Sequence, residues 1–398
     1  MRSGRLPCAF GARAPRRARG TSLLAALGVS RVARLTGLDR TGVEVAVAVR
    51  PSGHILQLSN GKGRTFAEAR ATAISEAAEL WAAERVEPSE LVFGSSRELA
   101  CRRDALLISP EELAADGSLV APRLSGPETI LAWRAGKELD GGRPALVPAH
   151  AVHCPPPGSP SLGPASLGWT SNGSAAHPRR AAALRHALLE LCERHQLALA
   201  LPDGFTPRAI RGRRLDPRSL PAAAPGANAL LGAMSAQGLE LELFDLTPSA
   251  VGRRAASRRP AGLGLPLAGA LLFDGDGPVP LAAGYACGLP RDRALRGAIL
   301  EAAQSRLTEI HGAREDAGEG PPPAWRELLR AIARSPMTDA RRMPSQPERA
   351  DGAAVDLILR RLARAGHRRA VAVELSPPGF PLAIVKVVVP GLLRSPLL

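Results

Sequence analysis

The sequence predicts an α+β fold. Three long segments rich in alanine and leucine, at 66–86, 179–200 and 293–312, have the composition and periodicity of helices. Before, between and after them lie short runs with β-branched or apolar residues, which predict strands. Strands and helices alternate irregularly, and this favours α+β over a regular α/β fold. With 398 residues and 45% hydrophobic content, the chain can form one large domain or two lobes.

The first predicted unit is a strand, a loop and a helix. VEVAVAVR (43–50) predicts the strand from its alternation, and SNGKG (59–63) after it predicts a glycine-rich loop. Thr65 and Glu68 then form the T-x-x-E pattern of a capping box. This pattern predicts the start of the first long helix.

The second unit follows a predicted strand at 145–152. Ser-Asn-Gly recurs at 171–173, and Pro178 occupies a position typical of the first turn of the second long helix. The run 282–290, which contains Tyr285, predicts a glycine-punctuated loop before the third helix. Further strands are predicted at 239–247, 268–275, 369–376 and 381–391.

Three polar segments are predicted to lie outside the compact part of the chain. Residues 1–30 read as an arginine-rich leader without order, so that the ordered domain begins near Arg31. The proline- and arginine-rich run 202–226 predicts a surface excursion, and 313–350 predicts a lid or a disordered loop.

Composition argues against nucleic acid as a partner. The net charge is +15, but all but three of the 52 basic residues are arginine, and aromatic residues make up only 3% of the chain. Few rings are therefore available for base stacking. The arginine excess, together with abundant Ala, Gly and Pro, indicates a coding bias rather than a basic patch.

The cysteines and the apolar runs predict a cytoplasmic protein. The five cysteines form no CxxC pair and no disulfide framework, which is typical of a reducing compartment. No apolar run reaches the roughly 18–20 residues that a membrane span needs.

Each of the three long helices carries a pair of polar residues three positions apart, which places both on one face. The pairs are Glu76 and Glu79, Glu190 and Glu193, and Glu301 and Gln304. The first two pairs follow Asn60 and Asn172 of their Ser-Asn-Gly tripeptides by 16 and 18 positions. Only three asparagines occur in the chain, so this spacing suggests one loop–helix unit used twice.

Facing carboxylates repel one another and need a cation. Carboxylate oxygens from two or three helices suit Mg²⁺, which brings nucleotide phosphates with it. Asn and Gly in the preceding loop allow unusual backbone angles and free N–H groups for phosphate oxygens. Lys62, one of three lysines with Lys137 and Lys386, can supply a point charge to a phosphate.

A structural interpretation without a metal site stays open beside this one. On the second helix, Leu184, Leu188 and Leu191 form the apolar stripe, and the Glu190–Glu193 pair points largely away from it, as on a solvated face. A Walker A loop is excluded, because Lys62 is followed by glycine and the first glycine of that motif is missing.

Four stretches together resemble the motif blocks of the YcaO family, in that family's order. They are SNGKGRTFAEARATAISEAAELWAAE (59–84), SNGSAAHPRRAAALRHALLELCER (171–194), ALRGAILEAAQSRLTEIHGARED (294–316) and PLAIVKVVVPGL (381–392). The opening LTGLDRTGVEVAVAVRPSG (35–53) resembles the branch whose members work with a partner called TfuA. The stretches are specific as a set, although each is weak alone.

The resemblance implies an α+β YcaO-type fold over residues 31–398, with mixed sheets and three long helices lining a nucleotide cleft. It implies ATP and Mg²⁺ as cofactors and assigns residues by matching position. The implied metal ligands are Glu76, Glu79, Glu190 and Glu193. The implied nucleotide-binding residues are Lys62, Thr72, Asn172, Arg194, Glu301, Gln304 and Arg306, with Arg314 as a weaker candidate.

The implied activity is ATP-dependent activation of a backbone amide in a peptide or protein. Thioamide formation with a TfuA-like sulfur-delivery partner is favoured, because the chain ends in GLLRSPLL without the proline-rich tail that azoline-forming members share. An azoline-forming cyclodehydratase and a non-catalytic scaffold stay open, as does a homodimer. Leu80 stands where many members have Arg, and Thr72 stands where many have Ser.

Histidines and cysteines outside the three pairs are further candidates. His150, His153 and Cys154 have short metal-like spacing, but a zinc site needs a fourth ligand and the segment reads as a strand. His186 lies on the same side of its helix as Glu190, and both a supporting role and a plain surface position stay open. Cys192 reads as a buried structural thiol.

Overall fold

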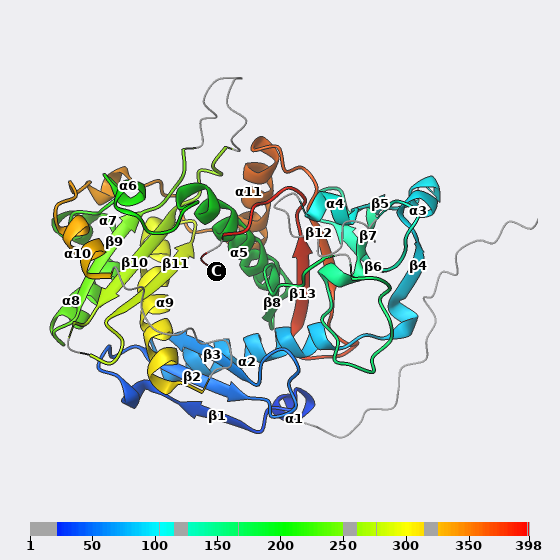
Figure 1. The fold of residues 1–398 in the computed structure, drawn as a ribbon, viewed down its shortest axis with the longest axis horizontal. Helices are drawn as coiled ribbons and strands as arrows, with labels where there is room; N and C mark the ends of the chain where they lie inside the picture. The colour runs from blue at the N-terminus through cyan, green and yellow to red at the C-terminus, as the bar shows by residue number, and fades with distance from the viewer. Residues whose placement is uncertain are drawn as a thin grey trace, which may run out of the picture.

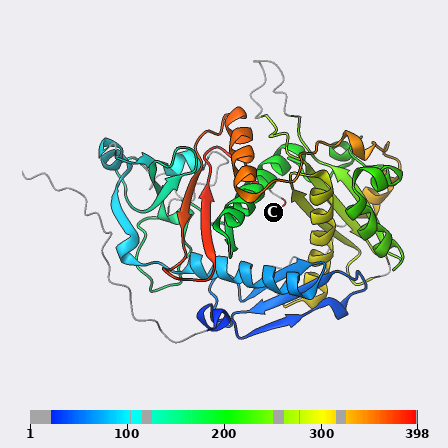
Figure 2. The same ribbon diagram turned by 180° about the vertical axis from the view of Figure 1, so that it is seen from behind.

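The computed structural model describes most of the chain. The described residues are 22–102, 104–114, 126–165, 167–249, 261–275, 277–313, 325–395 and 397. They form three β-sheets, and a long helix packs beside each sheet (Figure 1). The same three helices lie around the centre of the molecule when it is seen from behind (Figure 2).

Two of the sheets are antiparallel and three-stranded. In spatial order, the first contains β1 (Arg31–Arg34), β2 (Glu44–Val49) and β3 (Leu58–Gly63). The second contains β11 (Leu281–Cys287), β10 (Leu267–Phe273) and β9 (Glu240–Asp245). The large sheet is mixed, with the order β5-β7-β6-β12-β13-β8, and β4 pairs with β6. Its strands are β4 (Leu91–Ser95), β5 (Leu106–Leu107), β6 (Ile130–Glu138), β7 (Pro144–Pro148), β8 (Ser174–His177), β12 (Val371–Glu374) and β13 (Ala383–Val388).

Each of the three longest described helices packs against a different sheet. Helix α2 packs on the first sheet through small alanines, α9 packs on the second, and α5 packs with α11 against β13 of the third. Their bounds are α2 (Phe66–Glu84), α5 (Arg180–Ala200), α9 (Arg291–His311) and α11 (Asp351–Arg364). The shorter helices are α1 (Leu23–Ala26), α3 (Ser96–Arg102), α4 (Pro110–Leu113), α6 (Pro207–Ile210), α7 (Leu220–Ala223), α8 (Pro225–Ser235) and α10 (Trp325–Ala333).

Two glycine-containing runs that were predicted as loops are strands. SNGKG lies in β3, and the glycine-punctuated run before α9 forms β11, which contains Tyr285. Their glycines serve close packing. A Cβ atom at Gly61 would lie 2.2 Å from backbone atoms of α2, and one at Gly284 would lie 2.2 Å from the backbone of α9. These glycines therefore set how closely each helix approaches its sheet.

The second Ser-Asn-Gly is followed by a strand rather than directly by a helix. Strand β8 lies between this tripeptide and α5, which begins after Arg179. Pro178 precedes the helix, so the prediction that it lies in the first turn is wrong. At the first helix, Thr65 accepts the Glu68 N–H at 3.2 Å, but the Glu68 carboxylate accepts from Arg64 instead of completing the box.

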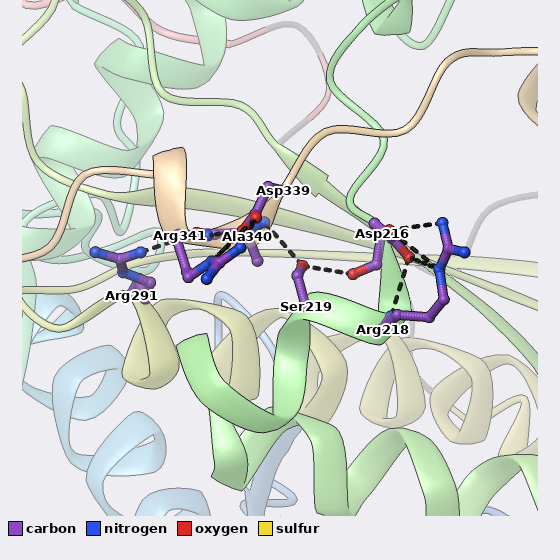
Figure 3. A network of polar contacts seen from close by, with 7 residues as sticks. All are labelled: Asp216, Arg218, Ser219, Arg291, Asp339, Ala340 and Arg341. Carbon is purple, nitrogen blue, oxygen red and sulfur yellow. Dashed lines mark hydrogen bonds and ion pairs between the residues drawn. The ribbon is translucent and has the colours of Figure 1, made fainter.

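The segment 202–226 is fastened to the body of the protein. The Ser219 hydroxyl donates to the Asp216 carbonyl at 2.6 Å and accepts the Ala340 N–H at 2.9 Å, and Arg291 donates to the Ala340 carbonyl (Figure 3). The segment also contributes buried side chains to the core, namely Ile210, Leu215, Leu220 and Ala224. It is therefore more than the surface excursion that the sequence predicts.

Ordered structure begins before Arg31. Helix α1 starts at Leu23, and Leu27 is buried against the core beneath α2, although residues 1–21 of the predicted leader lie outside the described residues. Of the predicted lid, 314–324 also lies outside them, and the rest includes α10. None of the described helices combines the length and apolar character of a membrane span.

Candidate functional site

The structure brings together acidic side chains from all three long helices. Burial raises the pKa of Glu79 on α2 well above its usual value, and the nearby charges of Glu190 and Glu76 raise it further. Burial likewise raises the pKa of Glu193 on α5 to about 8, and the charge of Glu301 on α9 adds to this effect. The polar faces of α2, α5 and α9 therefore converge, and their carboxylates repel one another.

Backbone N–H groups orient three of these carboxylates. The pairs are Glu79 with Ala176 at 2.8 Å, Glu190 with Gly173 at 3.1 Å, and Glu193 with Cys287 at 2.9 Å. Each donor lies on a strand or turn next to the helix that carries the acid. Each bond uses one carboxylate oxygen. The bond therefore also fixes the orientation of the carboxylate and the position of its second oxygen.

Two cationic side chains predicted for the nucleotide lie among these acids. Lys62 donates to Glu301 at 2.9 Å, and both side chains are about one quarter exposed. Such a partly exposed pair is weak and can exchange partners. Arg194 lies 3.6 Å from Glu190 and 3.7 Å from Glu193, and its buried Nε and Nη1 have no hydrogen-bond partner among the described residues.

Two polar residues predicted for the nucleotide, Thr72 and Gln304, also hold the structure together, and Asn60 of the first Ser-Asn-Gly does so with them. Gln304 of α9 donates to the Asn60 carbonyl at 3.4 Å, and the Asn60 amide donates to Thr308 at 2.7 Å. The Thr72 hydroxyl donates to the Lys62 carbonyl at 3.0 Å. The first Ser-Asn-Gly is thus bonded to α9, and Thr72 ties α2 to β3.

The second Ser-Asn-Gly forms a turn held by a residue to which the sequence assigned no role. Gly173 has a φ of +79°, and its carbonyl accepts the Val387 N–H at 2.7 Å. Lys386 of β13 donates to the Asn172 carbonyl at 2.8 Å, and burial lowers the pKa of Lys386 to about 7. The sequence feature that could have indicated this role is a lysine within the apolar run AIVKVVV, because a lysine inside a core needs polar partners.

Arg306 is not part of this cluster. It is 2% exposed and pairs with Asp39 at 3.1 Å and Asp274 at 2.8 Å. It lies five residues after Glu301, and this spacing turns it toward the other side of α9. The structure therefore gives Arg306 a role in packing and does not place it with the nucleotide residues. Arg314 lies outside the described residues.

A small pocket adjoins the acids. It has a volume of about 70 Å³ and lies between α5, β13 and the C-terminal segment. Its polar lining includes Thr170, Asn172, Arg194, Lys386 and Arg394. Arg194 is thus shared between the carboxylates and this pocket.

A model of the YcaO family, described as a YcaO cyclodehydratase that binds ATP and Mg²⁺, matches residues 60–393. The chain belongs to the YcaO family. This confirms the resemblance seen in the sequence. ATP and Mg²⁺ are the cofactors of the family.

Two similar proteins are uncharacterized. One, in the tfuA 3' region of Rhizobium leguminosarum bv. trifolii, is 30% identical over 381 residues, which cover 92% of this chain and 84% of that protein. The other, from Methanothermobacter thermautotrophicus, is 30% identical over 385 residues, which cover 93% and 91%.

Solved structures show the same fold. YcaO from Methanopyrus kandleri, bound with AMPPCP and Mg²⁺, aligns with a TM-score of 0.65 and 20% identity, over 93% of this chain and 87% of that one. A heterocyclase in complex with substrate and cofactor gives a TM-score of 0.71 and 19% identity, over 98% of this chain. This YcaO chain spans only 55% of that heterocyclase. The likeness confirms the α+β YcaO fold.

The acids of this YcaO chain fit Mg²⁺ by their chemistry. Glu79 and Glu193 are only partly exposed and lie near further carboxylates, so a cation offsets their repulsion. In the described part of the chain, no group of three or more His, Cys, Asp or Glu side chains is placed so that it could hold a metal ion by itself. Mg²⁺ typically takes one or two carboxylates and fills its other positions with water and phosphate oxygens, so a partial set suffices.

His186 faces the same region. Its side chain reaches solvent, yet desolvation by the surrounding protein lowers its pKa, Glu190 raises it, and Lys62 lowers it. It therefore lies near groups from both α5 and β3. Cys192 is buried, and burial raises its pKa, which agrees with a structural thiol.

The His150–Cys154 segment provides no metal site among the described residues. β7 ends at Pro148, earlier than the predicted strand, and a short 3₁₀ turn (Ala149–Ala151) follows. His153 is 3% exposed, and neither ring nitrogen has a hydrogen-bond partner in the described part of the chain. It is a neutral histidine of the core.

Acid is expected to destabilise the protein partly through His153. Burial lowers its pKa from 6.5 to about 4. Between these values the unfolded chain binds a proton that the folded chain does not, so stability falls as the pH falls through this window. The loss is roughly 2 kcal/mol, since one pKa unit corresponds to about 1.4 kcal/mol and the core relaxes in part.

Urea unfolding between pH 7 and pH 4.5 measures this effect. His153→Leu removes the titrating group and is expected to flatten the acid limb. His54→Leu, at an exposed position, serves as the control and keeps the limb of the parent. An equally steep limb in His153→Leu contradicts the assignment.

Proposed function

We propose that this YcaO chain activates a backbone amide of a peptide or protein with ATP and converts it into a thioamide. The observation that carries the proposal is the convergence of the three polar helix faces, with Glu79, Glu190 and Glu193 each oriented by a backbone N–H. Family membership supports ATP as the phosphoryl donor.

Phosphoryl transfer needs mainly positioning and neutralisation of charge. Glu76, Glu79, Glu190 and Glu193 would hold Mg²⁺, which when bound neutralises phosphate charge. Lys62 leaves Glu301 to contact a phosphate, and Nε and Nη1 of Arg194, which form no hydrogen bond within the described part of the chain, offer further donors. Residues Asn60, Thr72 and Gln304 keep β3, α2 and α9 in place around the nucleotide.

The reaction balances with a sulfur nucleophile. The amide oxygen takes the γ-phosphoryl group of ATP, which releases ADP. Hydrosulfide then adds to the amide carbon, the C–O bond breaks, and inorganic phosphate departs. Loss of the S–H proton leaves a C=S bond where the C=O bond stood. A sulfur-delivering partner of the TfuA type supplies the hydrosulfide, and the similarity to a protein in the tfuA 3' region supports this choice.

Co-expression with the neighbouring genes of its own genome, followed by mass spectrometry of the peptides, tests the proposal. The thioamide product is heavier than its precursor by the difference between sulfur and oxygen. Loss of one water instead identifies an azoline and overturns the thioamide assignment. Glu193→Gln is expected to abolish the modification, whereas Glu87→Gln, at an exposed position on the loop after α2, leaves it intact. A modification that persists in Glu193→Gln identifies a scaffold.

A further inference from the structure

The ammonium group of Lys386 is enclosed by one turn of the chain. Its Nζ lies 2.5 Å from the Thr170 carbonyl, 2.8 Å from the Asn172 carbonyl and 3.4 Å from the Ser174 hydroxyl. The same atom lies over the Trp169 ring, 5.5 Å from its centroid. An ammonium has three donors, and these three oxygens use them all.

This arrangement leaves Lys386 nothing to offer a substrate directly. The residue is only 3% exposed, although its side chain borders the pocket beside Arg194. A lysine without free donors acts through the groups that it holds.

The held turn and strand β8, which follows it directly, carry the backbone donors that orient two acids of the site. The Gly173 N–H binds Glu190 of α5, and the Ala176 N–H, two residues beyond Ser174, binds Glu79 of α2. The turn is joined to β13 on both sides of the lysine contact, because Gly173 accepts from Val387 and Ser174 pairs with Lys386 in register. Lys386 thus contacts the segment whose backbone N–H groups bind one acid of α5 and one acid of α2.

We infer that Lys386 is a positioning residue for the nucleotide site, which tethers residues 170–174 and thereby holds Glu79 and Glu190 in register across two helices. This inference rests on the proposed function. The loss of the tether frees the turn, so that both carboxylates lose their fixed direction even though no ligand of the site has been changed.

Lys386→Met, which keeps the length of the side chain and removes its donors, tests the inference. Amide hydrogen exchange at Gly173 and Ala176 is expected to accelerate at least tenfold, and the affinity for Mg²⁺-ATP in calorimetry to fall at least tenfold. Combined with Glu190→Gln, the change is expected to add less than its effect in the parent, because part of that effect acts through Glu190 and the rest through Glu79. Lys137→Met, which removes an exposed lysine of the same sheet, is expected to match the parent.

Other outcomes separate this inference from the proposed function. Unchanged exchange at both amides in Lys386→Met overturns the tether, as does full additivity with Glu190→Gln. A parent protein that binds no Mg²⁺-ATP overturns the proposed function, and with it the role of the tether at a nucleotide site. Should Lys386→Met fail to fold, Lys386→Gln keeps an amide donor and is expected to show an intermediate acceleration; exchange equal to the parent contradicts the tether.

Discussion

Glu79→Gln is expected to abolish Mg²⁺-nucleotide binding and at the same time to make the ligand-free protein more stable. The surrounding protein desolvates the carboxylate, and the charges of Glu190 and Glu76 oppose its ionisation, so the negative charge costs stability when no cation is present. Glutamine keeps an oxygen that accepts the Ala176 N–H. We expect activity to fall about 100-fold or more, as for other groups that stabilise charge in an active site.

Lost nucleotide binding together with increased stability distinguishes a functional acid from a structural one. Glu84, one and a half turns further along α2, forms a buried pair with Arg50 and accepts the His54 and Ile55 N–H groups. Glu84→Gln is therefore expected to lower the melting temperature and to leave nucleotide affinity per folded molecule unchanged. Calorimetry and thermal unfolding of both variants decide the matter: a destabilised Glu79→Gln that still binds Mg²⁺-ATP contradicts the metal assignment.

The convergence of the three helix pairs could be anticipated from the sequence because helical periodicity is local. Two residues three positions apart share a face whatever the rest of the chain does. The pairs Glu190–Glu193 and Glu301–Gln304 could therefore be found without knowing which sheets their helices cover. The solvated-face alternative is not what the structure shows, because the side chains of Glu190 and Glu193 are only 21% and 12% exposed.

The two Ser-Asn-Gly tripeptides show where local reasoning stops. Their similar distance from the following acid pair suggested one unit used twice, but Asn60 lies in a strand bonded to α9 and Asn172 lies in a turn bonded to β13. Glycine after asparagine suits a turn at Gly173, where φ is positive. At Gly61 the same residue serves helix packing instead. Propensity alone does not separate these uses.

The partners of single basic residues could not be predicted from the sequence either. Arg306 and Lys386 both belong to stretches that resemble family motifs, and neither pattern shows what lies around the side chain. Arg306 finds its partners in Asp39 and Asp274, one of them 267 positions away along the chain. Lys386 finds carbonyl groups more than 200 positions away, in the turn at 170–174. Such partners are fixed only by tertiary structure.

Gly61→Ala and Gly284→Ala are expected to cause the largest losses of stability among glycine substitutions in the helix–sheet contacts. The new methyl group would meet backbone atoms at 2.2 Å in each case, of Ala69 and Ala73 in α2 or of Ala302 in α9. Backbone cannot rotate away as a side chain can, so the whole helix must shift. We expect a cost of about 3 kcal/mol or more, at the upper end of overpacking effects.

The same shift reaches the site, because α2 carries Glu76 and Glu79 and α9 carries Glu301. Variants that fold are therefore expected to lose Mg²⁺-ATP affinity as well as stability. Gly232→Ala is the matched control: this glycine lies on the exposed side of α8 with no atom within 4 Å of the added Cβ. It is expected to gain about 0.5–1 kcal/mol from reduced backbone entropy of the unfolded chain. Urea unfolding of the three variants measures the contrast. Equal stability of Gly61→Ala and Gly232→Ala would show that α2 is not held against β3 at the distance that places its carboxylates.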